Sequence, residues 1–188
     1  MKIDIGGGGN PNIGYHNLDP VHGEGIWKIM AQEPWPVANG SVEAVSASHV
    51  LEHIPAGQDR IDTFNNAWNA LMPGGTLTIH VPLVGYTDNF NCSKVVNFWG
   101  AWADPTHVSH WWFPESLYYF YGDHTLKANA DYGIEFWNLG PCIADVEVEE
   151  ALSLDGGSWW SVIGGWEGVA RLEKPGVEQL TMKNEEFA

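Results

Sequence analysis

The chain has 188 residues, 44% of them apolar and 13% aromatic, which excludes a disordered protein and predicts one packed domain over residues 1–188. Lys and Arg number 8 against 24 Asp and Glu, and the resulting charge of −16 disfavours nucleic acid as a partner, because it repels phosphates. The 2 cysteines lack metal-like spacing, and no signal segment or membrane-length apolar run is seen, so we expect a reduced, cytoplasmic protein without membrane contact.

The first elements predicted along the chain are strands with a short connection. Met1–Ile5 is a strand-like run that ends at Gly6, and Tyr15–Asp19 reads as a second strand after turn residues at Asn10–Gly14. A parallel crossover usually takes about a dozen residues or more, so this connection is unusually short. Gly25–Ala31 is a candidate third strand.

A strand, a helix and a strand follow in that order. Val42–Ser48 has the composition of a buried strand, and Thr76–Val81 is a β-branched strand that we expect to end at Pro82. Between them, Asp59–Met72 predicts an amphipathic helix. Its apolar residues recur at intervals of three and four: Ile61, Phe64, Ala67, Trp68 and Leu71. This order predicts an α/β sheet with largely parallel strands.

The stretch after the fifth strand is an aromatic-rich insertion. Its aromatic cluster runs from Trp111 to Tyr121, and it can form core, a self-association surface that would make a homo-oligomer, or a stacking platform for a substrate. We favour core or self-association. Further along, Ile143–Leu152 and Ser161–Leu172 are strand candidates, with "DGGS" as a hairpin-like turn between them.

Four glycines in "KIDIGGGGNPNIGYHNLDP" lie between the first two strands, and Asp19 follows the second. A bare backbone lets N–H groups approach a ligand, and an acidic residue there can accept hydrogen bonds from a ribose diol. The pattern departs from the dinucleotide fingerprint because the helix that holds pyrophosphate is nearly absent. It favours a ligand with an adenosine and no phosphates. The alternative is a flexible glycine turn beside a solvated Asp19.

Several segments resemble, in unbroken order over roughly residues 1–120, the motifs of class I S-adenosylmethionine-dependent methyltransferases, particularly the compact ones of phage and bacterial genomes. They are "IDIGGGGN", "HNLDP", "EPWPVANGSVEAVSASHVLEHIP", "AWNALMPGGTLTIHVP" and "DPTHVSHWW". The resemblance implies a Rossmann-like, mostly parallel sheet with an antiparallel last strand. It also implies S-adenosylmethionine as cofactor, bound across the carboxyl ends of the first strands.

The resemblance assigns cofactor-binding roles to seven residues. It places Asp4, Gly6 and Gly8 beside the methionine part of the cofactor and Asp19 beside the ribose. It places Pro20 near the adenine, and Ser48 and His49 beside the sulfonium. Two positions depart from the family pattern. Met30 stands where many relatives have an aspartate that holds the adenine amino group, and Asn10 stands where a third glycine is common.

The histidines supply the catalytic candidates. His107, oriented by Asp104, can act as a general base, and its alternative role is to pin the surrounding segment through backbone hydrogen bonds. His49 and His53 have the spacing of two metal ligands on a helix, but Glu52 is misplaced for the H-E-x-x-H zinc motif. We therefore expect no metal.

The sequence favours an enzyme that transfers methyl groups from S-adenosylmethionine to a small-molecule or protein acceptor and not to nucleic acid. The first alternative is a catalytically idle protein with this fold that binds the cofactor or a partner in an assembly or regulatory role. The second is a nicotinamide-dependent reductase, which the short crossover and the absence of a Tyr-x-x-x-Lys dyad oppose.

Overall fold

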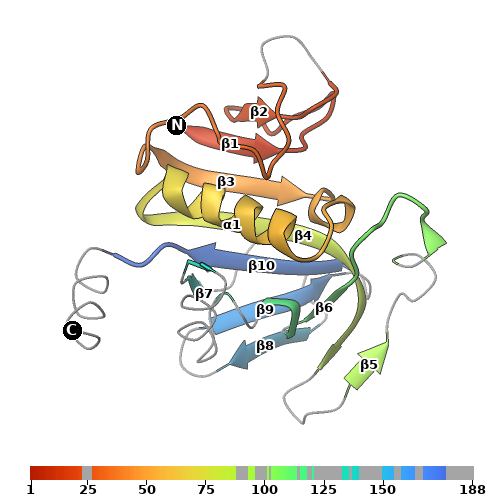
Figure 1. Ribbon diagram of the computed structural model, residues 1–188. Coiled ribbons are helices and arrows are strands. Elements are labelled where there is room, and N and C mark those ends of the chain that lie inside the picture. Colours follow the sequence, from red (N-terminus) through yellow and green to blue (C-terminus); the bar gives the residue numbers. More distant parts are fainter. Residues whose placement is uncertain are drawn as a thin grey trace.

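In this computed structural model, the structure describes residues 1–22, 27–87, 93–95, 101, 103–113, 115–117, 120, 133–135, 137–139, 150–154, 158–163 and 167–176. Within those ranges, no helix has the length and apolar character needed to cross a bilayer. The strands form one twisted sheet, and the N-terminal strands lie at its upper edge in Figure 1.

The N-terminal half of the sheet is parallel, as predicted. Its strands lie in the order β2-β1-β3-β4. Their bounds are Lys2–Ile5 for β1, His16–Leu18 for β2, Val42–Ser48 for β3 and Leu71–Thr87 for β4. Residues 6–15, between β1 and β2, contain no helix, which confirms the short connection. The candidate strand at Gly25–Ala31 is reduced, over its described residues 27–31, to an isolated parallel bridge from Leu18 to Trp27.

The C-terminal half of the sheet is antiparallel, which confirms the expected orientation of the last strand. β10 (Glu167–Glu173) lies antiparallel between β4 and β9 (Ser158–Ile163), and β8 (Glu150–Leu154) completes the edge. The single strand predicted over Ser161–Leu172 is wrong, because the chain reverses after Ile163 and pairs Glu167 with it. The glycine-rich sequence between them supplies residues suited to that turn. Residues 143–149 of the other predicted strand lie outside the described ranges.

β4 is longer than its predicted span. It runs past Pro82 and pairs with β5 (Ser93–Val95) and β6 (Trp111–Phe113), whereas the sequence indicated an end at Pro82. Pro82 lies beyond the last pair with β3 and opposite Glu167, the first residue of β10. A proline at the end of both ladders interrupts neither of them. The two remaining short elements are η2 (Glu115–Leu117) and β7 (Asn138–Leu139), which pairs with β10.

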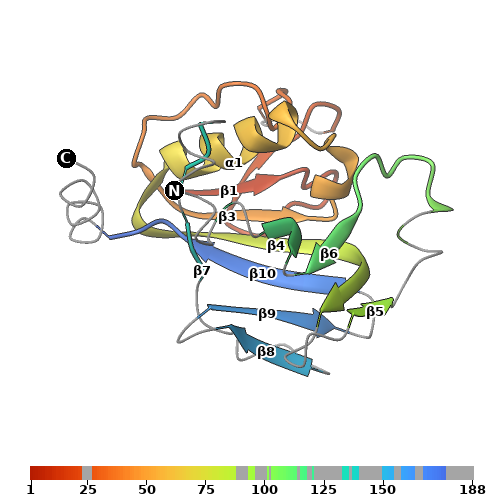
Figure 2. The same ribbon diagram turned by 60° about the horizontal axis from the view of Figure 1, so that its bottom comes forward.

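The helix α1 (Gln58–Ala70) covers one face of the sheet, and β6 lies on the same side (Figure 2). Phe64 of α1 is fully buried and stacks on Phe120 at 4.0 Å between ring centroids. Trp111, Phe113, Phe120 and Trp137 are also buried, so these aromatic side chains are core, as favoured. The sheet residues on this face are apolar and buried: Ile3, Ile5, Val45, Ala47, Leu77, Ile79, Ala170 and Leu172.

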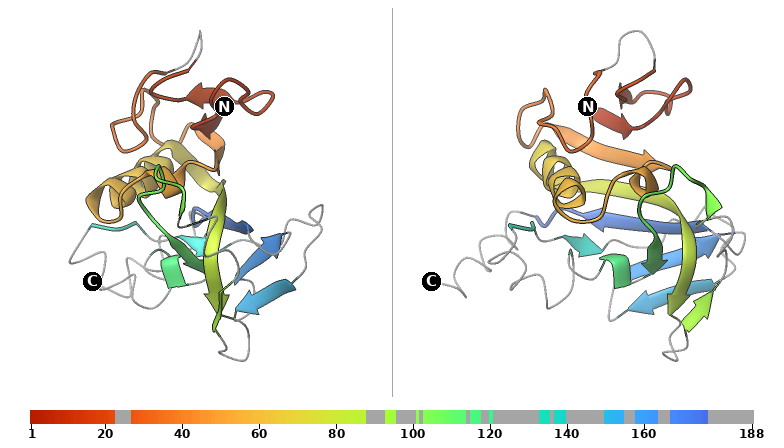
Figure 3. Two further views of the ribbon diagram at one scale, coloured as in Figure 1. Left: turned by 90° about the vertical axis from the view of Figure 1, so that its right-hand side faces the viewer. Right: turned by 45° about the vertical axis from the view of Figure 1, so that its right-hand side comes forward.

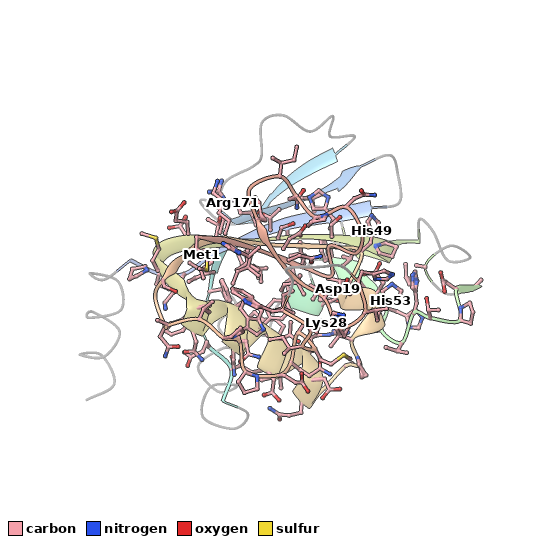
Figure 4. All side chains as sticks on the ribbon, turned by 90° about the horizontal axis from the view of Figure 1, so that it is seen from above. Met1, Asp19, Lys28, His49, His53 and Arg171 are labelled. Atoms are coloured by element: carbon pink, nitrogen blue, oxygen red, sulfur yellow. The ribbon has the colours of Figure 1, made fainter. Side chains whose placement is uncertain are left out.

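The opposite face of the sheet is polar. Asp4, Ser46, Thr78 and Arg171 lie in one row across β1, β3, β4 and β10, and all except Asp4 are partly exposed. Figure 3 shows α1 on one side of the sheet only, and Figure 4 shows Arg171 on the side away from it. The sheet thus buries one face well and leaves the other partly open.

A buried lysine joins the end of α1 to the end of β10. Lys174 Nζ donates hydrogen bonds to the carbonyl oxygens of Trp68 at 2.9 Å and Leu71 at 2.8 Å, and it lies 3.9 Å from the centre of the Trp68 ring. These carbonyls belong to the last turn of the helix, where cations are stabilised by the helix dipole.

We predict that Lys174→Met lowers the free energy of unfolding by about 2–4 kcal/mol, because two charge-assisted hydrogen bonds are lost. Urea denaturation followed by circular dichroism measures the change. Lys28→Met is the control, since Lys28 is exposed and its replacement should change stability by about 0.5 kcal/mol or less. Equal stability of the two variants would contradict the role of Lys174.

Candidate functional site

The glycine loop after β1 is shaped first by packing. Gly6 and Gly8 have positive φ angles of +66° and +56°, which favour glycine. The Gly6 N–H donates to the Leu18 carbonyl at 2.7 Å, and a Cβ on Gly6 would lie 2.5 Å from Val50 Cγ2. Gly6 therefore lets β1 pass close to Val50, whereas a Cβ on Gly8 would meet nothing within 4 Å.

Polar side chains beneath the loop fix its course. Asp4 Oδ2 accepts a hydrogen bond from the Asn12 N–H at 2.7 Å. Asn17 accepts from the Gly7 N–H at 3.1 Å through Oδ1 and donates through Nδ2 to the Gly8 carbonyl at 3.0 Å. Because Asp4 and Asn17 are both buried, these contacts satisfy polar groups that are screened from water.

Asp19 is the central acceptor of this region. Its carboxylate accepts three backbone hydrogen bonds, from Gly8 at 3.0 Å, Val21 at 2.8 Å and His22 at 2.8 Å, and the residue is 6% exposed. Burial raises the pKa of Asp19. These hydrogen bonds and the nearby His22 together lower it by more than burial raises it, so the pKa lies below its ordinary value. The carboxylate thus ties the glycine loop to the turn after β2.

An apolar pocket of about 120 Å³ opens at the carboxyl ends of the parallel strands, where Leu18 and Pro20, the chain neighbours of Asp19, line it and Asp19 itself does not. Its lining residues are Ile5, Gly6, Leu18, Pro20, Met30, Ala31, Gln32, Val50, His53 and Ile54. Figure 4 shows Asp19, His49 and His53 toward one end of the strands and Met1 toward the other. Ligands of open α/β sheets bind at this end of the strands.

The chain turns sharply after β3. His49 has a φ of 52°, which is uncommon for a residue with a side chain, and its N–H donates to the His80 carbonyl at 3.0 Å. The short helix η1 (Leu51–His53) follows, where the sequence indicated the start of a longer helix. Glu52 within it is 1% exposed, and its Oε1 lies 3.5 Å from His49 Nδ1.

A segment of the aromatic insertion docks on η1. The Glu52 carbonyl accepts hydrogen bonds from the N–H groups of Val108 at 2.9 Å and Ser109 at 3.0 Å. The Ser109 hydroxyl donates to the Leu51 carbonyl at 2.9 Å. These bonds hold residues 104–110, which include the catalytic candidates Asp104 and His107, against η1.

His107 and Asp104 are neighbours, but a backbone carbonyl orients the imidazole. His107 Nδ1 donates to the Ala101 carbonyl at 3.0 Å, whereas its Nε2 is 3.7 Å from Asp104 Oδ2. Hydrogen bonds from the Thr106 hydroxyl and N–H lower the pKa of Asp104. His107 is 11% exposed on its side chain, and its ring centroid lies 5.0 Å from that of His53, a pocket residue.

The structure brings the predicted site residues together in three groups. Gly6 and Pro20 line the pocket, Gly8 is bonded to Asp19, and Asp4 supports the loop from below. Ser48 and His49 lie at the end of β3 outside the pocket lining, and His107 with Asp104 reaches the pocket only through His53. The cofactor-binding and catalytic roles of all these residues remain predictions.

Sequence reasoning missed three contributors, which are Asn17, Val50 and Ile54. Asn17 lies within the predicted second strand, where a buried amide is unusual and could have indicated a loop clamp. Val50 and Ile54 look like ordinary apolar residues, and no local signal marks them as pocket walls.

Comparison with protein-family models gives no match, and neither does comparison with curated protein sequences. Solved structures are similar to this chain. The YcgJ protein of Bacillus subtilis superposes with a TM-score of 0.55 at 13% identity, over 93% of this chain and 91% of that one. A SAM-dependent methyltransferase from Archaeoglobus fulgidus gives 0.53 at 14%, over 92% and 85%.

A methyltransferase from Haloferax volcanii, solved in complex with the Trm112 methyltransferase activator, gives 0.51 at 14% identity, over 93% of this chain and 82% of that one. This chain has the fold of class I S-adenosylmethionine-dependent methyltransferases, as the sequence motifs implied. Identities this low establish the fold, and the activity has to be argued from the site.

We predict that Asp19→Asn lowers the free energy of unfolding by about 1–3 kcal/mol near neutral pH, because a buried acceptor of three N–H groups loses its charge. The lowered pKa means that this stabilisation is present above pH 3.8 and is lost as the pH falls through the folded-state value. In acid denaturation, the difference in free energy of unfolding between wild type and variant should shrink as the pH falls below 3.8 toward the folded-state pKa. An equal free energy of unfolding for wild type and variant at neutral pH would contradict the stabilising role that this geometry gives to Asp19.

Proposed function

We propose that the protein binds S-adenosylmethionine and transfers its methyl group to a small-molecule or protein acceptor. The observation that carries this proposal is the apolar pocket at the carboxyl ends of β1 and β2, beside the joined Gly8 and Asp19. A flat purine suits an apolar slot between Pro20 and Val50, and the polar remainder of the cofactor would extend along the glycine loop.

Asp19 has capacity for one more hydrogen bond. A carboxylate offers about four lone-pair sites, and backbone N–H groups occupy three of those on Asp19. A single ribose hydroxyl could therefore donate to it without breaking the loop. In this proposal Gly6, Gly8 and Asp4 lie beside the methionine part, and Pro20 contacts the adenine.

Charge favours this cofactor over a phosphate-bearing one. S-adenosylmethionine carries a sulfonium and an ammonium against one carboxylate, so it is attracted to a chain with a formal charge of −16. Asp4, Asp19 and Glu52 are buried carboxylates at or near the carboxyl ends of the first strands. The same charge argues against a nucleic-acid acceptor.

The chemistry requires an acceptor held in line with the sulfonium methyl group and, for a protonated nucleophile, a base. His107 suits that role because its Nδ1 hydrogen bond to the Ala101 carbonyl leaves the lone pair on Nε2. Asp104, 3.7 Å from Nε2, would stabilise the imidazolium after proton transfer.

A catalytically idle protein with this fold, which binds the cofactor or a partner protein in an assembly or regulatory role, is the second candidate. It is favoured by Asp19, whose carboxylate is already bonded to the chain's own N–H groups, and by the absence of a helix between β1 and β2. Met30 at the pocket also leaves the adenine amino group without the acidic partner common in the family.

We predict that S-adenosylhomocysteine at 100 times its dissociation constant stabilises the fold by about 2.7 kcal/mol. Thermal unfolding with and without the ligand measures this, with NADH as the comparison ligand. An unmoved melting temperature would remove the main support for cofactor binding, and stabilisation by NADH alone would favour a reductase.

Two matched variants locate the ligand. Met30→Trp adds bulk to the pocket wall, and we expect it to weaken S-adenosylhomocysteine binding by about tenfold or more, equivalent to about 1.4 kcal/mol. Met72→Trp is the control, because Met72 is 41% exposed, close to the 44% of Met30, and lies outside the pocket lining. Equal affinities in titration calorimetry would place the ligand elsewhere.

We predict that His107→Gln lowers kcat by about 10²–10⁴-fold with an acceptor whose nucleophile begins protonated, because the base is lost. The affinity for S-adenosylhomocysteine should stay within about twofold, since His107 is not in the pocket lining. Transfer of a tritiated methyl group to candidate acceptors measures the rate. An unchanged rate would leave His107 with the structural role of pinning its segment.

A further inference from the structure

We propose that Glu52, His53 and His107 bind a divalent first-row transition metal ion beside the pocket. One ligand atom from each residue lies within 4.8 Å of the other two, although His107 is remote in sequence. Two imidazoles and one carboxylate form a set of three protein ligands that leaves coordination positions open. This inference goes beyond the proposed methyl transfer and does not depend on it.

Both imidazoles have the tautomer that a metal requires. His53 Nδ1 donates to the Thr106 carbonyl and His107 Nδ1 to the Ala101 carbonyl, each at 3.0 Å. Because a carbonyl can only accept, Nδ1 carries a proton in each ring, and in the neutral imidazole the lone pair is then on Nε2. Histidines that ligate metals usually make this second hydrogen bond, which fixes the ring.

The carboxylate of Glu52 supplies an independent indication. The residue is 1% exposed, and its Oε2 has no hydrogen-bond partner among the residues that the structure describes. Its Oε1 lies 3.5 Å from His49 Nδ1 and 4.0 Å from His53 Nε2, so the carboxylate faces imidazoles that approach without a short hydrogen bond. A buried carboxylate oxygen left unpaired is costly, and a cation would compensate for it.

The framework around the three residues is held by backbone bonds. Glu52 and His53 belong to η1, and the N–H groups of Val108 and Ser109, the two residues that follow His107, both bond to the Glu52 carbonyl. Donors on a tetrahedral ion lie about 3.3 Å apart, so the cluster must contract by roughly 1.5 Å at its widest. The exposed His53 side chain is the group most free to move.

The donor set selects the class of ion. Imidazole nitrogens suit Zn²⁺, Fe²⁺ and Co²⁺, whereas Mg²⁺ and Ca²⁺ prefer oxygen ligands. His53 also lines the apolar pocket, so the ion would lie between the pocket and residues 104–110. A metal on His107 Nε2 would take up the lone pair that a general base needs, so metal binding and the base role exclude each other.

The experiment uses the full chain after treatment with EDTA and dialysis. CoCl₂ is titrated while the visible d–d absorption is recorded, and ZnCl₂ is then added as competitor; no cofactor or acceptor is present. We expect saturation at one Co²⁺ per chain and loss of the absorption with Zn²⁺. Failure of this titration leaves the cofactor-binding test untouched, so the two proposals fail separately.

Variants assign the ligands. His53→Ala, Glu52→Gln and His107→Gln should each weaken Co²⁺ binding beyond the roughly 10- to 100-fold loss typical of an outer-shell partner. His53 is exposed, so His53→Ala keeps the proposal testable if a buried variant fails to fold. His16→Gln is the control, because His16 is exposed at the amino end of β2, away from the three proposed ligands. This variant should bind Co²⁺ as the wild type does.

Three results would overturn the proposal. The first is that the Co²⁺ absorption does not saturate at one ion per chain. The second is that wild type and His53→Ala bind Co²⁺ with equal affinity. The third is that MgCl₂ stabilises the fold and ZnCl₂ does not. In the first case Glu52 would be held only by the ion pairs of its Oε1 with His49 and His53, in a cluster that binds no metal.

Discussion

One buried carboxylate organises the structure at the carboxyl ends of β1 and β2. Asp19 accepts N–H groups from Gly8 on one side and from Val21 and His22 on the other, so it fixes the glycine loop against the end of β2. Residues Gly6 and Pro20, which flank these contacts, form walls of the apolar pocket. The loop between β1 and β2 is held by side chains and not by a helix.

The polar face of the sheet is compatible with the short connection between β1 and β2. A doubly covered sheet needs apolar residues on both faces, but here the face away from α1 carries Ser46, Thr78 and Arg171, which remain partly exposed. Because much of that face is polar, a helix between β1 and β2 would have little apolar surface to bury there. Asp4 and Asn17 take over the task of fixing the loop from below.

The sequence predicted what depends on local pattern. The spacing of Phe64 and Ala67 predicted α1 almost to its ends, and the motifs implied a mostly parallel sheet with an antiparallel last strand. The sequence did not predict the extension of β4 beyond Pro82, because a proline usually ends a strand. Here Pro82 lies at the ends of the β3 and β10 ladders, so it interrupts neither of them.

Within the site, sequence reasoning selected Asp19 but not its bonding. Its partners are backbone N–H groups, which every residue carries, so no residue type could reveal them. The approach of His107 to Glu52 and His53 was equally invisible, since it depends on how residues 104–110 fold back onto η1. Contacts between distant segments require the tertiary structure.

The central claim is that the pocket beside Asp19 receives the adenosine of a sulfonium cofactor. Backbone amide NMR of the ¹⁵N-labelled chain during titration with S-adenosylhomocysteine tests it most directly. The account predicts saturable shifts concentrated at Gly6, Gly8, Val50 and Ile54, with the Lys2 and Thr76 amides unchanged. Shifts confined to residues outside the pocket and the glycine loop, or none at saturating ligand, would contradict it.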